Sequence, residues 1–200
     1  SGKLGRLVRY ECHYDYFRQQ GWYDHLGTLY NLAVHHIDQV VSLFGIPDAT
    51  RFDVRSIHHP GSGDDYYDLD FFYGQLKATV STSMCVLIDY PAYAVHGTNG
   101  SFTLPPAVHS SARQKTVGRH SVSSGAAPED RWGTLVYVKE GQPITERVAV
   151  GAAHYERIYD NLVTAIERGG EKCVSDEETL CVLDVLEAAT RVAASHGARR

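Results

Sequence analysis

The stretch GTLYNLAVHHIDQVVSLFGIP, Gly27 to Pro47, decides how the rest of this sequence folds. Its two ends predict one helix, because Thr28 is a suitable N-cap and Gly45 with Pro47 supplies a stop. At about 100° per residue, one broad side of that helix is largely apolar and carries Leu29, Ala33, His36, Ile37, Val40 and Phe44. We therefore expect the helix to bury this side against the remaining elements.

The opposite side of the same helix carries a narrow polar stripe of Asn31, His35, Asp38 and Ser42. A polar stripe on a helix is most often just a solvated face. An imidazole with a carboxylate one turn away can also act as an oriented base near neutral pH. The pattern alone leaves both interpretations open.

Composition bounds the class of protein. The chain has 200 residues, 43% of them hydrophobic, which suits one or two domains with a real core. The formal net charge is −5 and charges of both signs are interspersed, so no basic stripe suggests nucleic acid and no polybasic segment suggests a membrane surface. The sequence contains no run of eighteen apolar residues and no signal-peptide pattern at its start.

Cysteine and histidine spacing gives no indication of a metal site. The four cysteines show no C-x-x-C pair, which favours a reduced, cytoplasmic setting; they are Cys12, Cys85, Cys173 and Cys181. His35 and His36 point about 100° apart on a helix and cannot share one ion. None of the eleven histidines forms an H-x-x-x-H array, so we expect no bound metal.

Two-residue alternation predicts strands at residues 2–17 and repeatedly between 50 and 150. The glycine-rich GTNG at 97–100 has strands on both sides and no following helix, which favours a tight turn over a phosphate loop.

Residues 105–130 are rich in Pro, Ser, Gly and Ala and are expected to form a mobile loop. A helix is predicted at 152–168, and Ser175 with Glu178 forms a capping box for another, whose predicted apolar stripe is Leu180, Leu183, Leu186, Ala189 and Val192.

The order of these elements predicts the fold. Six or seven strands in meander order, with one early helix and two late ones, indicate a single α+β domain over residues 1–200. We expect a largely antiparallel open-faced sheet with helices packed on one face. The other sheet face then needs a cover, and the thirteen tyrosines of the chain are compatible with a tyrosine-rich association surface there.

The helix at 27–47 resembles the signature helix of the C-terminal domain of the Gfo/Idh/MocA oxidoreductases, commonly G-x-L-Y-D-L-G-x-H-x-x-D. Residue by residue, the Asp, His and second Asp of that pattern fall on Asn31, His35 and Asp38. The resemblance implies that His35 is the proton-transfer residue, that Asp38 assists it, and that Asn31 and Tyr30 contact substrate. Asn31 departs from the pattern, because an amide can hold a hydroxyl but cannot act as a base.

The loop at 18–26 lies over the substrate site in members of this family, which makes Arg18, Trp22 and Tyr23 candidate substrate contacts. An ordinary surface loop is at least as good an interpretation of the same residues. The family's Gly segment at the start of its C-terminal domain matches Gly2 to Val8, which suggests a chain cut at a domain boundary.

The resemblance also implies a function for the whole protein. Family members oxidise a CH–OH group of a sugar, polyol or related small molecule with NAD or NADP, and associate as dimers through the open sheet face. The sequence contains neither the G-x-G-x-x-G motif nor the E-K-P lysine of the nucleotide domain, so this chain alone is expected to bind no cofactor and to be inactive. The alternative is a stand-alone, non-catalytic module that binds a small ligand or serves in assembly.

Overall fold

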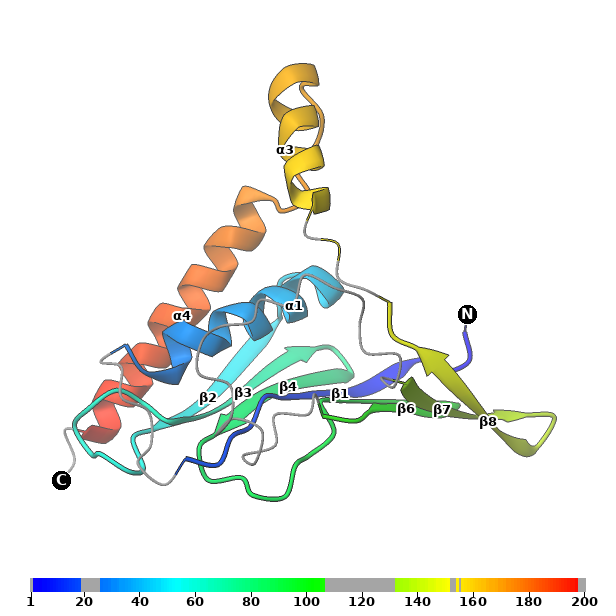
Figure 1. The fold of residues 1–200 in the computed structure, drawn as a ribbon, viewed down its shortest axis with the longest axis horizontal. Helices are drawn as coiled ribbons and strands as arrows, with labels where there is room; N and C mark the ends of the chain where they lie inside the picture. The colour runs from blue at the N-terminus through cyan, green and yellow to red at the C-terminus, as the bar shows by residue number, and fades with distance from the viewer. Residues whose placement is uncertain (1, 19–25, 107–131, 152–153, 155, 198–200) are drawn as a thin grey trace, which may run out of the picture.

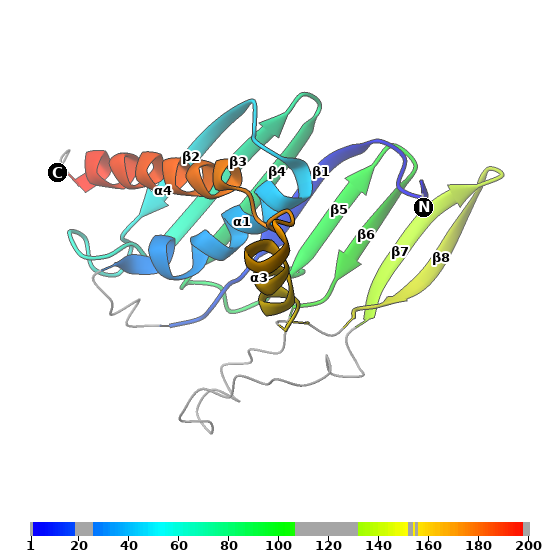
Figure 2. The same ribbon diagram turned by 90° about the horizontal axis from the view of Figure 1, so that it is seen from above.

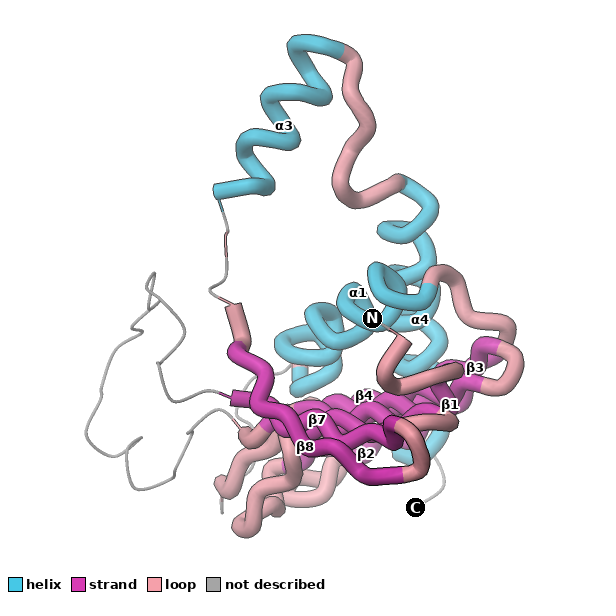
Figure 3. Tube along the Cα trace, turned by 90° about the vertical axis from the view of Figure 1, so that its right-hand side faces the viewer, coloured by secondary structure: helices cyan, strands magenta, loops and turns pink. Residues whose placement is uncertain are grey.

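The computed structural model describes residues 2–18, 26–106, 132–151, 154 and 156–197. These residues form one eight-stranded sheet in the order β2-β3-β4-β1-β5-β6-β7-β8, with helices on one side (Figures 1 and 3). The strands are β1 (Leu7–His13), β2 (Ala49–Arg55), β3 (Tyr66–Tyr73), β4 (Leu76–Ser83), β5 (Tyr93–Gly97), β6 (Gly100–Leu104), β7 (Trp132–Lys139) and β8 (Gln142–Ala149). The predicted α+β class, with a mostly antiparallel sheet, is confirmed.

The strand order differs from the predicted meander at one place. β1 lies in the middle of the sheet, parallel to β4 and antiparallel to β5, with Tyr10 opposite both Ala78 and Val95. A parallel pair needs a crossover connection, and the helix that follows β1 supplies the first part of it. β1 is also shorter than the predicted strand at 2–17, although Tyr14 and Tyr16 still donate backbone hydrogen bonds to the carbonyls of Ser81 and Ser83.

Two helices cover one half of the sheet (Figure 2). Helix α1 (Val34–Phe44) and helix α4 (Asp176–Gly197) lie over β1 to β4 and enclose the core. The core side chains come from both layers and include Ile37, Val40, Val54, Leu69, Phe71, Val80, Leu186 and Ala189. Burying each of the larger ones stabilises the fold by roughly 1.5–3 kcal/mol, so this half holds α1 firmly in place.

Helix α3 (Glu156–Arg168) stands away from the sheet and buries none of its side chains (Figure 1). The helix that the sequence predicts here carries Ile158, Leu162 and Ile166 on one side, and all three are exposed. Gly169, at φ +63°, follows its last residue, as expected for a helix stop.

Helix α4 begins with the predicted capping box. The backbone N–H of Ser175 donates to the Glu178 carboxylate at 2.7 Å, and the Glu178 N–H donates back to the Ser175 hydroxyl at 3.1 Å. The predicted apolar stripe is wrong at Leu180 and Leu183, which are 60% and 51% exposed. The helix is rolled so that a neighbouring stripe meets α1 and β2, and the buried residues are Val182, Val185, Leu186 and Ala189.

The open face of the sheet carries charges and hydroxyls. The side chains that line it include Arg9, Glu11, Arg51, Asp53, Asp68, Asp70, Lys77, Thr79 and Ser81. The expected tyrosine-rich surface is wrong for the described strands, because Tyr10, Tyr67, Tyr73 and Tyr93 lie in or against the core and Tyr66 alone among strand tyrosines lines this hollow. Strand alternation explains the difference, since these four tyrosines fall in register with buried neighbours.

Some predicted features fall on residues that the structure does not describe. Trp22 and Tyr23 are among them, as are residues 107–130 of the predicted loop at 105–130. The two predictions therefore stay predictions.

Candidate functional site

The helix that carries the polar stripe begins with a π-helical turn. Segment η1 (Leu29–Ala33) is π-helical and runs directly into α1. Each hydrogen bond of a π-turn spans five residues, so side chains here depart from the predicted 100° spacing, and such turns are frequent at functional sites. The predicted buried side holds in spite of this, and the helix ends at Gly45, at φ +81°.

The start of this helix is held by a residue far along the chain. The Thr28 hydroxyl donates to the Asp64 carboxylate at 2.6 Å, and the Leu29 backbone N–H donates to the same carboxylate oxygen at 2.8 Å. Thr28 stands at the N-cap position that the sequence predicts, but its side chain makes no capping hydrogen bond. The hydroxyl is a donor, and the Asp64 carboxylate accepts the Leu29 N–H at the helix N-terminus. Burial raises the pKa of Asp64, while the hydrogen bonds from Thr28 and Leu29 lower it.

Gly27 allows this close approach. It has φ +71°, and a Cβ atom built on it would lie 2.2 Å from Oδ1 of Asp64. Only glycine fits both the backbone conformation and the space, so Gly27 fixes where the helix meets the Asp64 loop.

His35 and Asp38 lie on the exposed side of α1, as predicted. Among the described residues, neither side chain makes a hydrogen bond or ion pair that the structure records, so Asp38 does not hold the His35 imidazole here. Asp38 lines a shallow hollow between α1 and the sheet together with Gln39, Ser42, Tyr93 and Phe102. His35 is thus an accessible imidazole on a rigidly packed helix.

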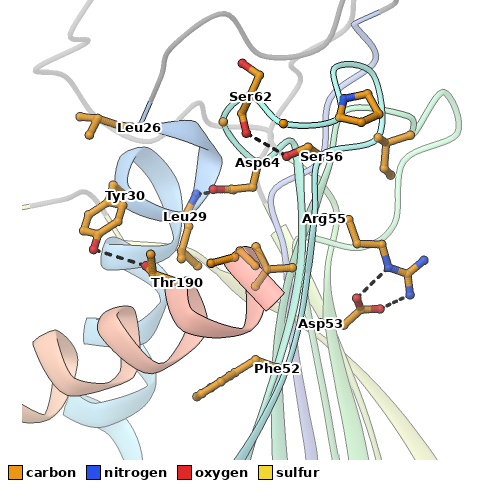
Figure 4. A pocket seen from close by; sticks show the side chains of 17 residues that line it. Leu26, Leu29, Tyr30, Phe52, Asp53, Arg55, Ser56, Ser62, Asp64 and Thr190 are labelled. Carbon is orange, nitrogen blue, oxygen red and sulfur yellow. Dashed lines mark hydrogen bonds and ion pairs between the residues drawn. The ribbon is translucent and has the colours of Figure 1, made fainter. Parts of the chain in front are cut away.

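Asn31 and Tyr30 form hydrogen bonds with residues other than His35 and Asp38. The Asn31 amide donates to the Gly27 carbonyl at 2.7 Å, and the Tyr30 hydroxyl accepts a hydrogen bond from Thr190 of α4 at 3.3 Å. Figure 4 shows Tyr30 beside Thr190 in a groove that Leu26 and Phe52 also line. His35 does not line this groove, so the structure does not bring Tyr30 and His35 into one pocket.

Arg18 is the last described residue before the loop that follows β1. Its guanidinium lies 5.1 Å from the centre of the Tyr16 ring, and its backbone N–H donates to the Met84 carbonyl. The segment leading to the predicted substrate loop is therefore tied to the end of β4.

A buried polar chain lies under α1, and the sequence gives no signal that links its members. His36 Nδ1 is 2.8 Å from the Tyr67 hydroxyl, which accepts a hydrogen bond from Thr82 at 2.7 Å. The Tyr67 proton therefore points to His36, whose Nδ1 acts as acceptor in the neutral ring. Burial lowers the pKa of His36 to about 4, so the ring is neutral at neutral pH.

The described residues hold no metal-ligand group, and their glycine-rich turn at 97–100 is not a phosphate loop. No group of three or more His, Cys, Asp or Glu side chains in the described part of the chain could hold a metal ion. Gly97 and Gly100 serve the turn between β5 and β6, because a Cβ on each would collide with the Leu4 or Val136 carbonyl oxygen. These glycines make room for protein backbone and do not form a phosphate cradle at a helix N-terminus. In the same described residues, no helix is both long enough and apolar enough to cross a membrane.

Comparison with known proteins gives consistent matches over nearly the whole chain. Residues 1–198 match the family model described as "Oxidoreductase family, C-terminal alpha/beta domain". The oxidoreductase YhhX of Escherichia coli is 38% identical over 195 residues, and scyllo-inositol 2-dehydrogenase (NADP(+)) IolW of Bacillus subtilis is 28% identical over 198 residues. Each match covers 94% of this chain and 55% of the relative, so the chain spans about half the length of these relatives.

Solved structures agree with these matches. A crystal structure of the probable oxidoreductase YhhX superposes with a TM-score of 0.80 at 35% identity, covering 95% of this chain and 56% of that one. An oxidoreductase from Bacillus cereus also gives a TM-score of 0.80, at 31% identity, with coverage of 95% and 66%.

Proposed function

The chain belongs to the Gfo/Idh/MocA oxidoreductase family, as its C-terminal domain, and on that premise we propose that it is the substrate-binding and subunit-association half of an NAD(P)-dependent oxidoreductase. The substrate is a sugar, polyol or related hydroxylated small molecule, oxidised at a CH–OH group. The likeness to the NADP(+)-linked scyllo-inositol dehydrogenase IolW supports a polyol. By itself, this chain is expected to be inactive.

The single observation that carries the proposal is the exposed imidazole of His35 on a helix whose other side is fully packed. A packed helix keeps the imidazole in a defined place without occupying its ring nitrogens. In the proposed reaction, a ring nitrogen of His35 takes the proton of the substrate hydroxyl. In this proposal the nicotinamide is bound mainly by parts of the protein outside the described residues.

The other site residues have supporting roles in this proposal. Asp38, one turn from His35, supplies negative charge that favours the imidazolium formed by proton transfer. The Asn31 side chain contacts a second substrate hydroxyl, in addition to the hydrogen bond that its amide N–H₂ donates to the Gly27 carbonyl. Tyr30, Arg18 and the two residues of the following loop, Trp22 and Tyr23, complete the substrate contacts.

The proposed assembly is a homodimer or larger homo-oligomer in the cytoplasm, formed through the open sheet face. Charges of both signs alternate on this face, and several already pair within the chain, such as Lys77 with Asp70 at 2.8 Å. When a second copy of this face packs against the first around a twofold axis, the charges left unpaired on one copy can meet opposite charges on the other.

The second candidate function is a non-catalytic module that binds a small ligand or serves in assembly. The observation that favours it is Asn31, an amide at the place of the family's carboxylate, which donates to a backbone carbonyl of its own helix. A residue so placed supports binding and helix structure but no proton transfer.

The first experiment is the intact mass and N-terminal sequence of the native polypeptide, followed by His35→Gln in that native form. Turnover of polyols with NAD or NADP should fall by about 10²-fold or more, with little change in KM, because a general base acts in the transition state. His154→Gln changes an exposed histidine outside the site and should leave turnover unchanged. Unchanged turnover in His35→Gln would exclude His35 as the base, and no turnover in the native protein would favour the binding module.

A further inference from the structure

The side chains of Cys85, His58 and Asp65 lie near the end of β4, away from the α1 site, and contact one another in that order. The Cys85 thiol lies 3.9 Å from Nε2 of His58, and the His58 Nδ1 lies 2.5 Å from a carboxylate oxygen of Asp65. Cys85 is exposed to solvent, whereas Asp65 is 2% exposed. The order from surface to interior is therefore thiol, imidazole, carboxylate.

Asp65 is fixed by its surroundings. Its carboxylate accepts the backbone N–H groups of Ile57 at 2.6 Å and His58 at 3.0 Å, as well as the His58 ring. Its own carbonyl accepts the N–H of Met84 at 3.1 Å, which ties the His58 loop to the residue next to Cys85. Both the base and the thiol are thus positioned by the same buried residue.

These hydrogen bonds decide the tautomer of the imidazole. The carboxylate can only accept, so the His58 Nδ1 carries the proton that it receives. In the neutral ring Nε2 is then the acceptor, and it is the nitrogen that faces the Cys85 sulfur. Transfer of the thiol proton to Nε2 gives a thiolate beside an imidazolium, which the Asp65 carboxylate stabilises.

The arrangement suits a nucleophile and not a metal ion. The thiol and the carboxylate lie on opposite nitrogens of one imidazole, so the three groups cannot converge on one centre. The other described cysteines, Cys12, Cys173 and Cys181, lack such a partner. Burial raises the pKa of Cys12 to about 12 and also raises the pKa of Cys181, and the structure records no histidine on the exposed Cys173. Activation is therefore specific to Cys85.

We propose that Cys85 is a reactive thiol and a modification site for low-molecular-weight disulfides, with His58 as its base and Asp65 as the residue that positions the base. The Cys85 thiolate attacks one sulfur of the small disulfide and forms a new sulfur–sulfur bond to it. The original disulfide bond breaks, and its second sulfur leaves as a thiolate that takes the proton held on His58. One thiol and one disulfide are consumed, and one mixed disulfide and one thiol are formed.

The modification would sit beside the segment that leads to the predicted substrate loop. Cys85 pairs with Phe17 across an isolated bridge, and the Val86 N–H donates to the Tyr16 carbonyl at 3.0 Å. A group attached to Cys85 therefore lies next to the residues that precede Arg18.

The test is the rate at which oxidised glutathione forms a mixed disulfide at each cysteine of the native protein, followed by peptide mass spectrometry at neutral pH. Cys173 serves as the exposed control within the same molecule. We expect Cys85 to react about tenfold faster than Cys173, because Nε2 of His58 lies beside the sulfur and can take its proton as it attacks. Equal rates in the unaltered protein would overturn the proposal without need of a variant.

Two variants then assign the cause. His58→Gln should lower the Cys85 rate to that of Cys173, with the melting temperature checked in parallel. His154→Gln removes a histidine that also pairs with a carboxylate, Glu156 at 2.7 Å, and should leave the Cys85 rate unchanged. A fast Cys85 in folded His58→Gln protein would show that exposure alone explains its reactivity and would overturn the role of His58.

Discussion

The hydroxyl of Thr28 donates a 2.6 Å hydrogen bond to the carboxylate of Asp64, which stands 36 residues later in the chain. The same carboxylate accepts the Leu29 N–H, so one buried side chain satisfies the N-terminus of the helix that carries His35. The position of that helix therefore depends on a contact between two distant segments and not on a local cap.

Removal of Asp64 should destabilise the protein through two unsatisfied donors. Asp64→Ala leaves the buried Thr28 hydroxyl and the Leu29 N–H without their acceptor, which should cost about 2–4 kcal/mol in the free energy of unfolding. Thr28→Val should cost about 1 kcal/mol in the natural chain and far less in Asp64→Ala. Urea unfolding of the four proteins gives the coupling energy, and additive losses would contradict the shared hydrogen bond.

Gly27 and Gly45 form a matched pair, because both have positive φ but only one is crowded. Gly45→Ala places its Cβ in open space and should cost about 1–2 kcal/mol for backbone strain alone. Gly27→Ala adds a collision with Asp64 and should cost about 3 kcal/mol or more in total. Thermal or urea unfolding compares the two, and equal losses would show that the Asp64 loop moves aside freely.

His36 should make stability fall as the solution is acidified. Its pKa is about 4 in the folded protein and about 6.5 when unfolded, so the unfolded chain binds the extra proton between these values. Stability is fully present above pH 6.5 and should decrease by up to about 3 kcal/mol as the pH approaches 4.

The charged and titratable groups around His36 act in both directions, since Asp15 raises its pKa whereas His35 and His13 lower it, but burial is the largest cause. His36→Gln should therefore flatten the slope of unfolding free energy between pH 6.5 and 4. His154→Gln, at an exposed position, should keep the slope. An unchanged slope in His36→Gln would assign the acid sensitivity to other groups.

The open sheet face can be tested by one substitution on β7. Val136 is 39% exposed and lies in register with Ser101, His96 and Arg9 across this face. Val136→Arg should convert the proposed dimer to a monomer in light scattering, because it places an unpaired charge in the interface.

Val148 provides the control for that substitution. It is 38% exposed and lies on the helix side of β8, so Val148→Arg should leave the association unchanged. A dimer that survives Val136→Arg but dissociates in Val148→Arg would place the interface on the opposite face.

The sequence predicts those features of the fold that depend on neighbours in the chain. The buried side of α1, its stop at Gly45 and the capping box at Ser175 follow from local spacing, and all are confirmed. The central place of β1 and the direction of the strand tyrosines are not local properties, because they depend on which strands pair across the sheet.

In the candidate site too, the features set by local spacing are predicted and those set by contacts between distant segments are not. His35 and Asp38 lie on the exposed side of α1 because a packed helix keeps its periodicity. The spacing does not predict the π-turn at Asn31 or the helix N-terminus at Asp64, which arise from contacts between distant segments. It also gives no sign of the series from Cys85 through His58 to Asp65, which the connection between β2 and β3 and the residues after β4 assemble.

The central position of β1 also has a consequence for how the domain reaches its native state. β1 precedes both of its partners in the chain, and Arg9 finds its neighbours only at Lys77 and His96. Closing such long loops before any pairing is gained slows folding, so this topology has a high contact order. During synthesis both edges of β1 stay unpaired until β4 and β5 have left the ribosome. In that interval the unpaired backbone of the nascent chain is most exposed to association with other chains.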